Sequence, residues 1–145
     1  MTEAIRFEVA GKPVPWARSG GNGKVRFTPA KVRHNQNYIK MLAAEAMKGR
    51  PPMDGPLRLS MAAVLPVPSS WTKKKQAQAL NKEIFPTGKP DLDNLVKSVK
   101  DACNQIVYVD DAQVVFSSQG KSYGDRPRLI IEIAPVTESE LKVAV

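Results

Sequence analysis

The sequence predicts a small α+β domain in which helices pack on one side of a mixed or antiparallel sheet. Three observations support this fold class: segments that alternate apolar and polar residues, two segments with an apolar face at helical spacing, and Gly/Pro-rich turns between them. With 145 residues the chain can bury one core but is short for two. We therefore expect one domain over residues 1–135 and a short C-terminal tail over 136–145.

The N-terminal half should contain a strand, a loop and a long helix. Residues 4–10 alternate apolar and polar side chains, which is typical of a half-buried strand. Residues 11–23 are rich in glycine and proline and predict a loop, and residues 25–28 suit a short strand. A Thr-Pro pair then forms a helix start, which predicts a helix from about Pro29 to Lys48. Its apolar face would bury Ile39, Leu42, Ala43 and Ala46.

The C-terminal half should add strands and helices around an acidic segment. Residues 57–65 predict a strand, which nearby prolines close. Ser70 or Thr72 can cap a basic helix that reaches Leu80, and residues 83–90 connect it to the acidic segment. The remaining expected elements are strands over 114–121 and 129–133, a turn over 124–127, and a single frayed turn within 136–145.

The overall composition narrows the function classes. A formal net charge of +8 favours binding to nucleic acid or to another acidic surface. A hydrophobic content of 42% is that of an ordinary globular domain rather than of a disordered chain. No apolar run approaches the ~20 residues that span a bilayer, and the first residues lack the pattern of a signal peptide. We therefore expect a cytoplasmic protein without a membrane partner.

Cysteine and histidine are too rare for several kinds of site. The single cysteine, Cys103, cannot form an internal disulfide and stands among apolar residues, which indicates a reducing compartment and a packing role. His34 is the only histidine, and we expect it on the surface. One histidine cannot build a His-based metal centre, which argues against zinc or HNH-type chemistry.

One predicted helix begins where the acidic residues gather. Asp91 follows Pro90 at the helix start, where an aspartate suits both the cap and the helix dipole. At about 100° per residue, the apolar side chains of this helix fall within an arc of roughly 120°. We expect this arc to be the buried face, made of Leu92, Leu95, Val96, Val99, Ala102 and Cys103.

Charged residues lie on the opposite side of the same helix. Asp93, Lys97 and Asp101 follow one another at i, i+4 and i+8, and Asp91 can swing its side chain beside Asp93. Carboxylates so close repel each other unless a divalent cation relieves the repulsion. A metal ion also lets carboxylates lie beside phosphates. Acids concentrated on a basic chain therefore indicate a metal-dependent enzyme that acts on a polyanion, and we expect it to cut DNA.

The same acids also suit ordinary structural roles. Asp91 could serve only as a helix cap, and Asp93 with Lys97 only as an exposed ion pair. Asp110 and Asp111 lie between apolar segments and could be solvated turn residues. The residues alone leave these alternatives open.

Two motifs stand in the acidic segment. They read Pro90-Asp91-Leu92-Asp93-Asn94-Leu95 with Lys97 and Asp101-Ala102 after it, and Asp110-Asp111-Ala112-Gln113-Val114-Val115 with Lys121 after it. With these motifs the segment 89–121 closely resembles the RusA family of Holliday junction resolvases. The N-terminal half resembles the phage and prophage branch of that family at Phe7, Val9, Gly11, Pro13 and the basic helix after Pro29.

The resemblance implies a RusA-like fold, a homodimer and a nuclease that resolves four-way DNA junctions. It also implies that Asp91, Asp93 and Asp111 bind the metal and that Lys97 is the essential lysine. Mg²⁺ fits such a site because it prefers oxygen ligands and keeps several waters, and we expect Mn²⁺ to substitute. Lys97, one helical turn after Asp93, could reach a phosphate oxygen and offset charge in the transition state.

Three polar residues near the predicted metal ligands are expected to support the site rather than to bind the metal directly. We expect Asp110 to shape its turn and Asp101 to lie about two helical turns from the metal. Asn94 either orients a ligand or caps the helix, and the sequence favours neither role.

Basic residues elsewhere are candidate DNA contacts. Those that flank the glycine-rich loop could form an arm along the DNA backbone. The three lysines of the predicted basic helix either contact phosphate or form a solvated face, and this region looks like an insertion relative to the shortest family members. Trp16 either stacks on DNA or packs on the core, and packing is the more common role. The candidates are Lys12, Trp16, Arg18, Arg26, Lys73, Lys74, Lys75 and Lys121.

These observations predict paired, symmetric hydrolysis of phosphodiesters in branched DNA. A chain this short has room for one active site, so a two-fold dimer would supply the second. Another branched-DNA or flap nuclease would use the same residues. A junction-binding protein without activity would not need the intact set of Asp91, Asp93, Lys97 and Asp111.

Overall fold

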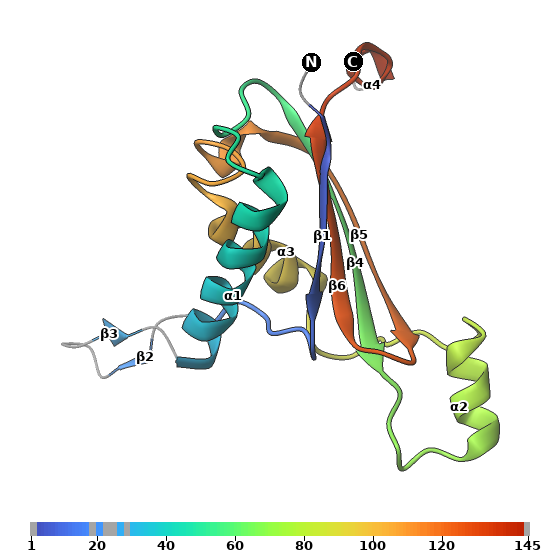
Figure 1. Ribbon diagram of the computed structural model, residues 1–145. Coiled ribbons are helices and arrows are strands. Elements are labelled where there is room, and N and C mark those ends of the chain that lie inside the picture. The colour runs from blue at the N-terminus through green and yellow to red at the C-terminus, as the bar shows by residue number, and fades with distance from the viewer. Residues whose placement is uncertain (1–2, 18–19, 22–25, 28–29, 144–145) are drawn as a thin grey trace.

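The computed structural model describes residues 3–17, 20–21, 26–27 and 30–143. Its centre is a four-stranded sheet with the strand order β1-β6-β4-β5. Strand β6 runs antiparallel to both of its neighbours, whereas β4 and β5 are parallel. The predicted α+β class is therefore confirmed, with a mixed sheet (Figure 1). The strands are β1 (Ile5–Ala10), β4 (Leu57–Pro66), β5 (Val114–Gly124) and β6 (Arg128–Pro135).

Two helices, α1 (Ala30–Met47) and α3 (Leu92–Cys103), cover one face of this sheet (Figure 1). Helices α2 (Lys73–Leu80) and α4 (Glu138–Val143) lie beyond its two ends. The predicted packing of helices on one side of the sheet is made by α1 and α3. Helix α2 buries only Ala79 and contacts strand β5 rather than the face that α1 and α3 cover.

Two short elements complete the chain. Strands β2 (Gly20–Gly21) and β3 (Arg26–Phe27) pair as an antiparallel ribbon near the start of α1 (Figure 1). A 3₁₀ turn over Asp111–Gln113 leads into β5. No helix in the described ranges is long and apolar enough to cross a membrane.

The core lies between the sheet and helices α1 and α3. Strand β1 buries Ile5, Phe7 and Val9, as its predicted period-two pattern requires. Burial raises the pKa of the Cys103 thiol to about 12, so this buried cysteine stays neutral and packs as predicted. The predicted apolar face of α3 is confirmed, with Leu92 partly buried and the other members fully so: Leu95, Val96, Val99, Ala102 and Cys103.

Helix α1 is placed as predicted, with a slightly rotated buried face. Its predicted start at Thr28 and Pro29 lies outside the described residues. Leu42 and Ala46 are only partly buried, at the edge of the buried face. The buried residues of α1 are Val32, Ile39, Ala43 and Met47.

The tail forms a short helix rather than a single frayed turn. Arg58 Nε lies 3.4 Å from Glu140 Oε2, which ties α4 to strand β4. The backbone N–H of Val136 also donates to Pro56 O at 3.1 Å. The division into a domain over 1–135 and a tail over 136–145 stays a prediction.

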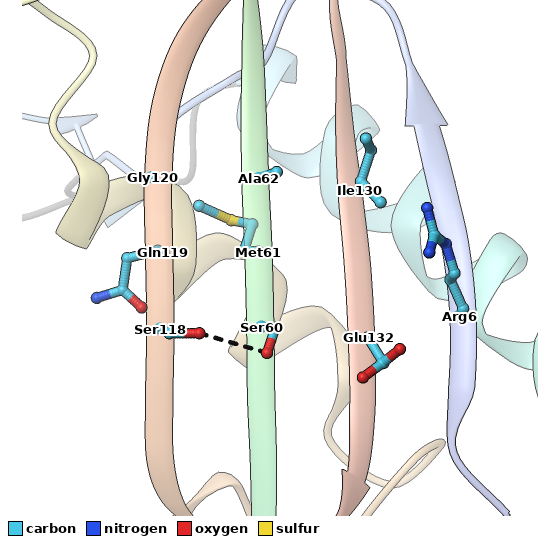
Figure 2. Close-up of a pocket in the computed structure, with 9 residues that line it drawn as sticks. All are labelled: Arg6, Ser60, Met61, Ala62, Ser118, Gln119, Gly120, Ile130 and Glu132. Atoms are coloured by element: carbon cyan, nitrogen blue, oxygen red, sulfur yellow. Dashed lines mark hydrogen bonds between the residues drawn. The ribbon is translucent and has the colours of Figure 1, made fainter.

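The face of the sheet opposite α1 and α3 carries both polar and apolar side chains (Figure 2). It holds a hollow of about 450 Å³ across all four strands. Ser118 Oγ donates to Ser60 Oγ at 3.3 Å on its floor. The carboxylate in its lining, Glu132, is already paired with Arg58 at 3.3 Å. This face therefore lacks the grouped carboxylates that the sequence predicts for the active site.

Candidate active site

A cleft of about 400 Å³ lies between α3 and the N-terminal part of β5. It brings together two of the three predicted metal ligands, Asp93 and Asp111, with the predicted essential lysine, Lys97. The third predicted ligand, Asp91, stands exposed at the N-cap of α3 and does not line the cleft. The remaining lining residues are Val96, Lys100, Ser117 and Gln119.

Helix α3 presents its charged residues to the cleft because its apolar residues fix its rotation.

The alternative roles of these charged residues, a helix cap for Asp91 and an ion pair between Asp93 and Lys97, are not observed. Asp91 makes no side-chain cap hydrogen bond, so its carboxylate is not used by the helix start. In the described part of the chain, ion pairs join only arginines to glutamates, and Asp93 and Lys97 do not pair. These two carboxylates and the ammonium are therefore not committed to each other or to the helix.

Asp111 is held in place by hydrogen bonds to its own turn. Asp110 caps the 3₁₀ turn through its Oδ1, which accepts from Ala112 N at 3.0 Å, so Asp110 shapes the turn as expected. Asn104, the residue after α3, accepts from Asp111 N through Oδ1 at 2.9 Å. This bond connects the end of α3 directly to the second acidic motif.

Gln113 fastens the same turn to the rest of the domain. Its Oε1 accepts from Val109 N at 3.0 Å and from Asp110 N at 3.2 Å. Its Nε2 donates to Met53 O at 2.9 Å and to Gly55 O at 3.0 Å. Sequence reasoning assigned no role to Gln113 or Asn104. An Asp followed three residues later by Gln is a capping-box pattern, and that signal could have identified Gln113.

The pKa values of the two acids of this turn, Asp111 and Asp110, are shifted in opposite directions. Partial burial raises the pKa of Asp111, its hydrogen bond to Asp110 adds to that rise, and Lys100 opposes it. The N–H of Ala112 lowers the pKa of Asp110, and its hydrogen bond to Asp111 lowers it further. The charged form of Asp111 is therefore disfavoured by its surroundings, and a nearby cation would reverse that effect.

The donor set of the cleft fits a magnesium ion bound by few protein ligands. Among the described residues, no three acidic, histidine or cysteine side chains are grouped to hold a metal ion. Mg²⁺ commonly takes one or two carboxylates and completes its shell with waters and substrate phosphate. Asp93 and Asp111 supply two such carboxylates on one cleft. Asp91, close by in sequence and free of capping, stays a predicted third ligand.

Lys121 holds the loop that precedes the carboxylate helix. Its Nζ donates to Gly88 O at 2.7 Å and to Pro90 O at 3.1 Å. The side chain thus ties β5 to the residues directly before Asp91. The predicted contact of Lys121 with DNA is not needed to explain its position.

Replacing Lys121 by Met should loosen this loop and slow the proposed cleavage. We expect a loss of about 1–3 kcal/mol in the free energy of unfolding, because two charge-assisted hydrogen bonds disappear. Lys82→Met is a matched control, since Lys82 Nζ donates to Tyr123 O at 2.7 Å, away from the cleft. Urea unfolding and cleavage rates of both variants test this, and equal cleavage by the two would contradict a role for Lys121 in the site.

The other predicted DNA contacts lie on exposed surface where they are described. Lys12, Lys73 and Lys74 are exposed, and Lys75 Nζ lies 4.0 Å from the ring centroid of Trp71. Arg18 lies outside the described residues, and for Arg26 only the backbone within β3 is described. The structure brings none of the four described lysines, Lys12, Lys73, Lys74 and Lys75, into the cleft. His34 is exposed, as predicted.

Trp16 lies against the carboxylate helix. Its backbone N–H donates to Asn94 O at 3.0 Å, and Lys97 Nζ lies 4.8 Å from its ring centroid. The ring is half-buried rather than projected into solvent. The contact that the structure gives for the ring is the predicted essential lysine, and both predicted roles of Trp16, stacking on DNA and packing on the core, stay predictions.

Comparison with known proteins gives one consistent family. Residues 7–134 match the family model described as endodeoxyribonuclease RusA. The chain is 38% identical over 143 residues to the uncharacterized protein YqaN of Bacillus subtilis strain 168, covering 93% of this chain and 99% of that protein. It is 30% identical over 144 residues to the crossover junction endodeoxyribonuclease rusA of Lactococcus phage r1t, covering 94% and 100%. The chain belongs to the RusA family of endodeoxyribonucleases.

Proposed function

We propose that this protein is a metal-dependent endodeoxyribonuclease that resolves four-way DNA junctions by paired phosphodiester hydrolysis. The observation that carries the proposal is the single cleft that gathers Asp93, Asp111, Lys97 and Lys100. Carboxylates beside ammonium groups suit a metal ion and a phosphate bound together. Membership of the RusA family and the net charge of +8 support DNA as the substrate.

Each residue of the cleft has a distinct role in this mechanism. Asp93 and Asp111 would hold Mg²⁺, with Asp91 as the predicted further ligand. When bound, the ion would polarise the phosphate and lower the pKa of a water molecule. Lys97, one helical turn after Asp93, would bind a phosphate oxygen and stabilise the charge that develops there. Lys100 would add positive charge beside Asp111, where it already opposes the rise in the pKa of that carboxyl.

Junction resolution requires two nicks in strands of like polarity. The described residues of one chain provide one cleft of this composition, so we propose a two-fold homodimer that presents two clefts to one junction. The phage relative is named as a crossover junction endodeoxyribonuclease, which supports a four-way junction as the substrate. The exposed lysines would bind the phosphates of the junction arms.

A panel of DNA substrates tests this proposal. A four-way junction, a flap, a replication fork and linear duplex of equal length are incubated with the protein and Mg²⁺. We expect cleavage of the junction to be fastest and linear duplex to stay intact. Faster cleavage of the flap or fork would assign another branched-DNA activity to the same cleft. Binding of the junction without cleavage of any substrate would indicate a non-catalytic protein.

Junction binding should depend strongly on salt. If lysines and arginines hold DNA through its phosphates, log affinity should fall linearly with log salt at about −0.9 per phosphate contacted. Fluorescence anisotropy of a labelled junction between low and moderate salt measures this slope. An affinity that does not change with salt would contradict binding through the basic surface.

A further inference from the structure

We propose that Trp16 is a positioning residue that holds the ammonium group of Lys97 beside the carboxylate cleft. This inference rests on the proposed function, because it assigns Trp16 a role through the lysine of the same site. The two residues are 81 positions apart in the sequence, and the contact arises only in the folded chain.

Hydrogen bonds hold the backbone around Trp16 independently of the contact between its ring and Lys97. The N–H of Trp16 donates to Asn94 O, in the first turn of α3, at 3.0 Å. Two residues earlier, Val14 O accepts from Asn35 Nδ2 of α1 at 3.3 Å. The same amide lies 3.4 Å from Ser98 Oγ, which is 1% exposed on α3. The backbone of the segment is thus bound to both helices, which holds the Cα of Trp16 beside the first turns of α3.

The ring acts on a side chain that has few other constraints. Lys97 is exposed and makes no ion pair with Asp93, which lies one helical turn before it. A lysine with four rotatable bonds samples many positions unless something restricts it. The face of an indole attracts an ammonium group, and Lys97 Nζ lies 4.8 Å from the ring centroid. The contact therefore restricts Lys97 and leaves the Asp93 carboxylate available for a metal ion.

A direct contact of the indole with DNA is the competing role. A base that stacked on Trp16 would need a free ring face, whereas the ring is half-buried and Lys97 lies over it. The two roles differ in what the loss of the ring affects. Loss of a stacking platform weakens DNA binding, but loss of a positioning contact slows the step that needs Lys97.

A double-mutant cycle separates these outcomes. Trp16→Leu and Trp16→Phe are made in the wild-type chain and in Lys97→Ala, and single-turnover cleavage and junction affinity are measured. We expect Trp16→Leu to slow cleavage about tenfold and Trp16→Phe less, because phenylalanine keeps an aromatic face. Junction affinity should change less than about twofold. In the Lys97→Ala chain, Trp16→Leu should cause almost no further loss, since the lysine it positions is absent.

Trp71 provides a matched control. It is also a half-buried tryptophan with a lysine over its ring, Lys75 at 4.0 Å, but it packs against Tyr123 beside α2, away from the cleft. Trp71→Leu should leave the single-turnover rate unchanged. Thermal unfolding of every variant identifies losses that come from instability alone.

Tryptophan fluorescence detects the contact between Trp16 and Lys97 in the absence of DNA. The chain has two tryptophans, so Trp71→Phe leaves Trp16 as the single indole fluorophore. Adding Lys97→Met removes the charge over that ring and should change its emission, whereas Lys40→Met should not. An emission spectrum that Lys97→Met leaves unchanged would overturn the contact.

The activity results distinguish failure of this inference from failure of the proposed function. Junction cleavage by the wild type with full activity in Trp16→Leu overturns only the positioning role. If Trp16→Leu slows cleavage equally in the wild-type and Lys97→Ala chains, the positioning role is also overturned. If Trp16→Leu weakens junction affinity as much as it slows cleavage, the ring contacts DNA instead. A wild type that cleaves no junction overturns the proposed function, and the catalytic role of Trp16 with it.

Discussion

Asp93→Asn and Asp111→Asn should each reduce junction cleavage by about 10³-fold or more and leave junction binding nearly unchanged. The expected size follows because a bound metal ion contributes several kcal/mol to the transition state, and 1.36 kcal/mol is a factor of ten in rate. Asparagine keeps the shape of aspartate but removes the charge that attracts the ion. DNA affinity should persist, because the basic surface is untouched. Single-turnover cleavage and anisotropy binding measure the two quantities separately.

The matched control is Asp125→Asn, which changes an exposed acid in the turn between β5 and β6. It should cleave at the wild-type rate. Asp91→Asn tests the ligand that the monomer leaves outside the cleft, and we expect it to be as inactive as the other two. Wild-type rates in any two of these three active-site variants would contradict the three-carboxylate proposal.

Lys97→Ala should slow cleavage by roughly 10²-fold or more, the scale expected when a group that stabilises transition-state charge is lost. Its effect on the free energy of unfolding should be small, because Lys97 is exposed and pairs with no acid among the residues that the structure describes. Junction affinity should change far less than the rate, since many other basic residues remain. Rates, affinities and urea unfolding of the same variant separate these effects.

Lys97→Arg is the more selective variant. It keeps the charge but changes the reach and the hydrogen-bond geometry, so we expect strongly impaired cleavage. Lys40→Ala, which removes an exposed lysine of α1, is the matched control and should keep its rate. Near-normal cleavage by both Lys97→Ala and Lys97→Arg would remove Lys97 from the mechanism.

The carboxylate helix was predictable because its apolar residues recur at helical spacing. That pattern fixed which side of α3 is buried, and it therefore also placed Asp93 and Lys97 on the outward side. Strand β1 was predictable for a similar reason, since its alternation of buried and exposed residues is a local property. Local periodicity thus identified the elements that carry the site.

The assembly of the cleft was not predictable from local patterns. The backbone N–H of Asp111 donates to Asn104 Oδ1, and its turn is held by Gln113, whose Nε2 donates to carbonyls about sixty residues away. The parallel pairing of β4 and β5 joins strands separated by α2 and α3, and no turn signal marks it. The contact between Trp16 and Lys97 likewise depends on tertiary packing. Only the family resemblance connected the two acidic motifs at the level of sequence.

The most direct test of the central claim is cleavage of a four-way junction, labelled in turn on each strand, in Mg²⁺ and in excess EDTA. The account predicts paired nicks at symmetric positions in two strands of like polarity, none in EDTA, and recovery when Mg²⁺ is restored in excess of the chelator. Mn²⁺ should also restore cleavage. Cleavage that persists in EDTA, or nicks confined to one strand, would contradict a metal-dependent junction resolvase.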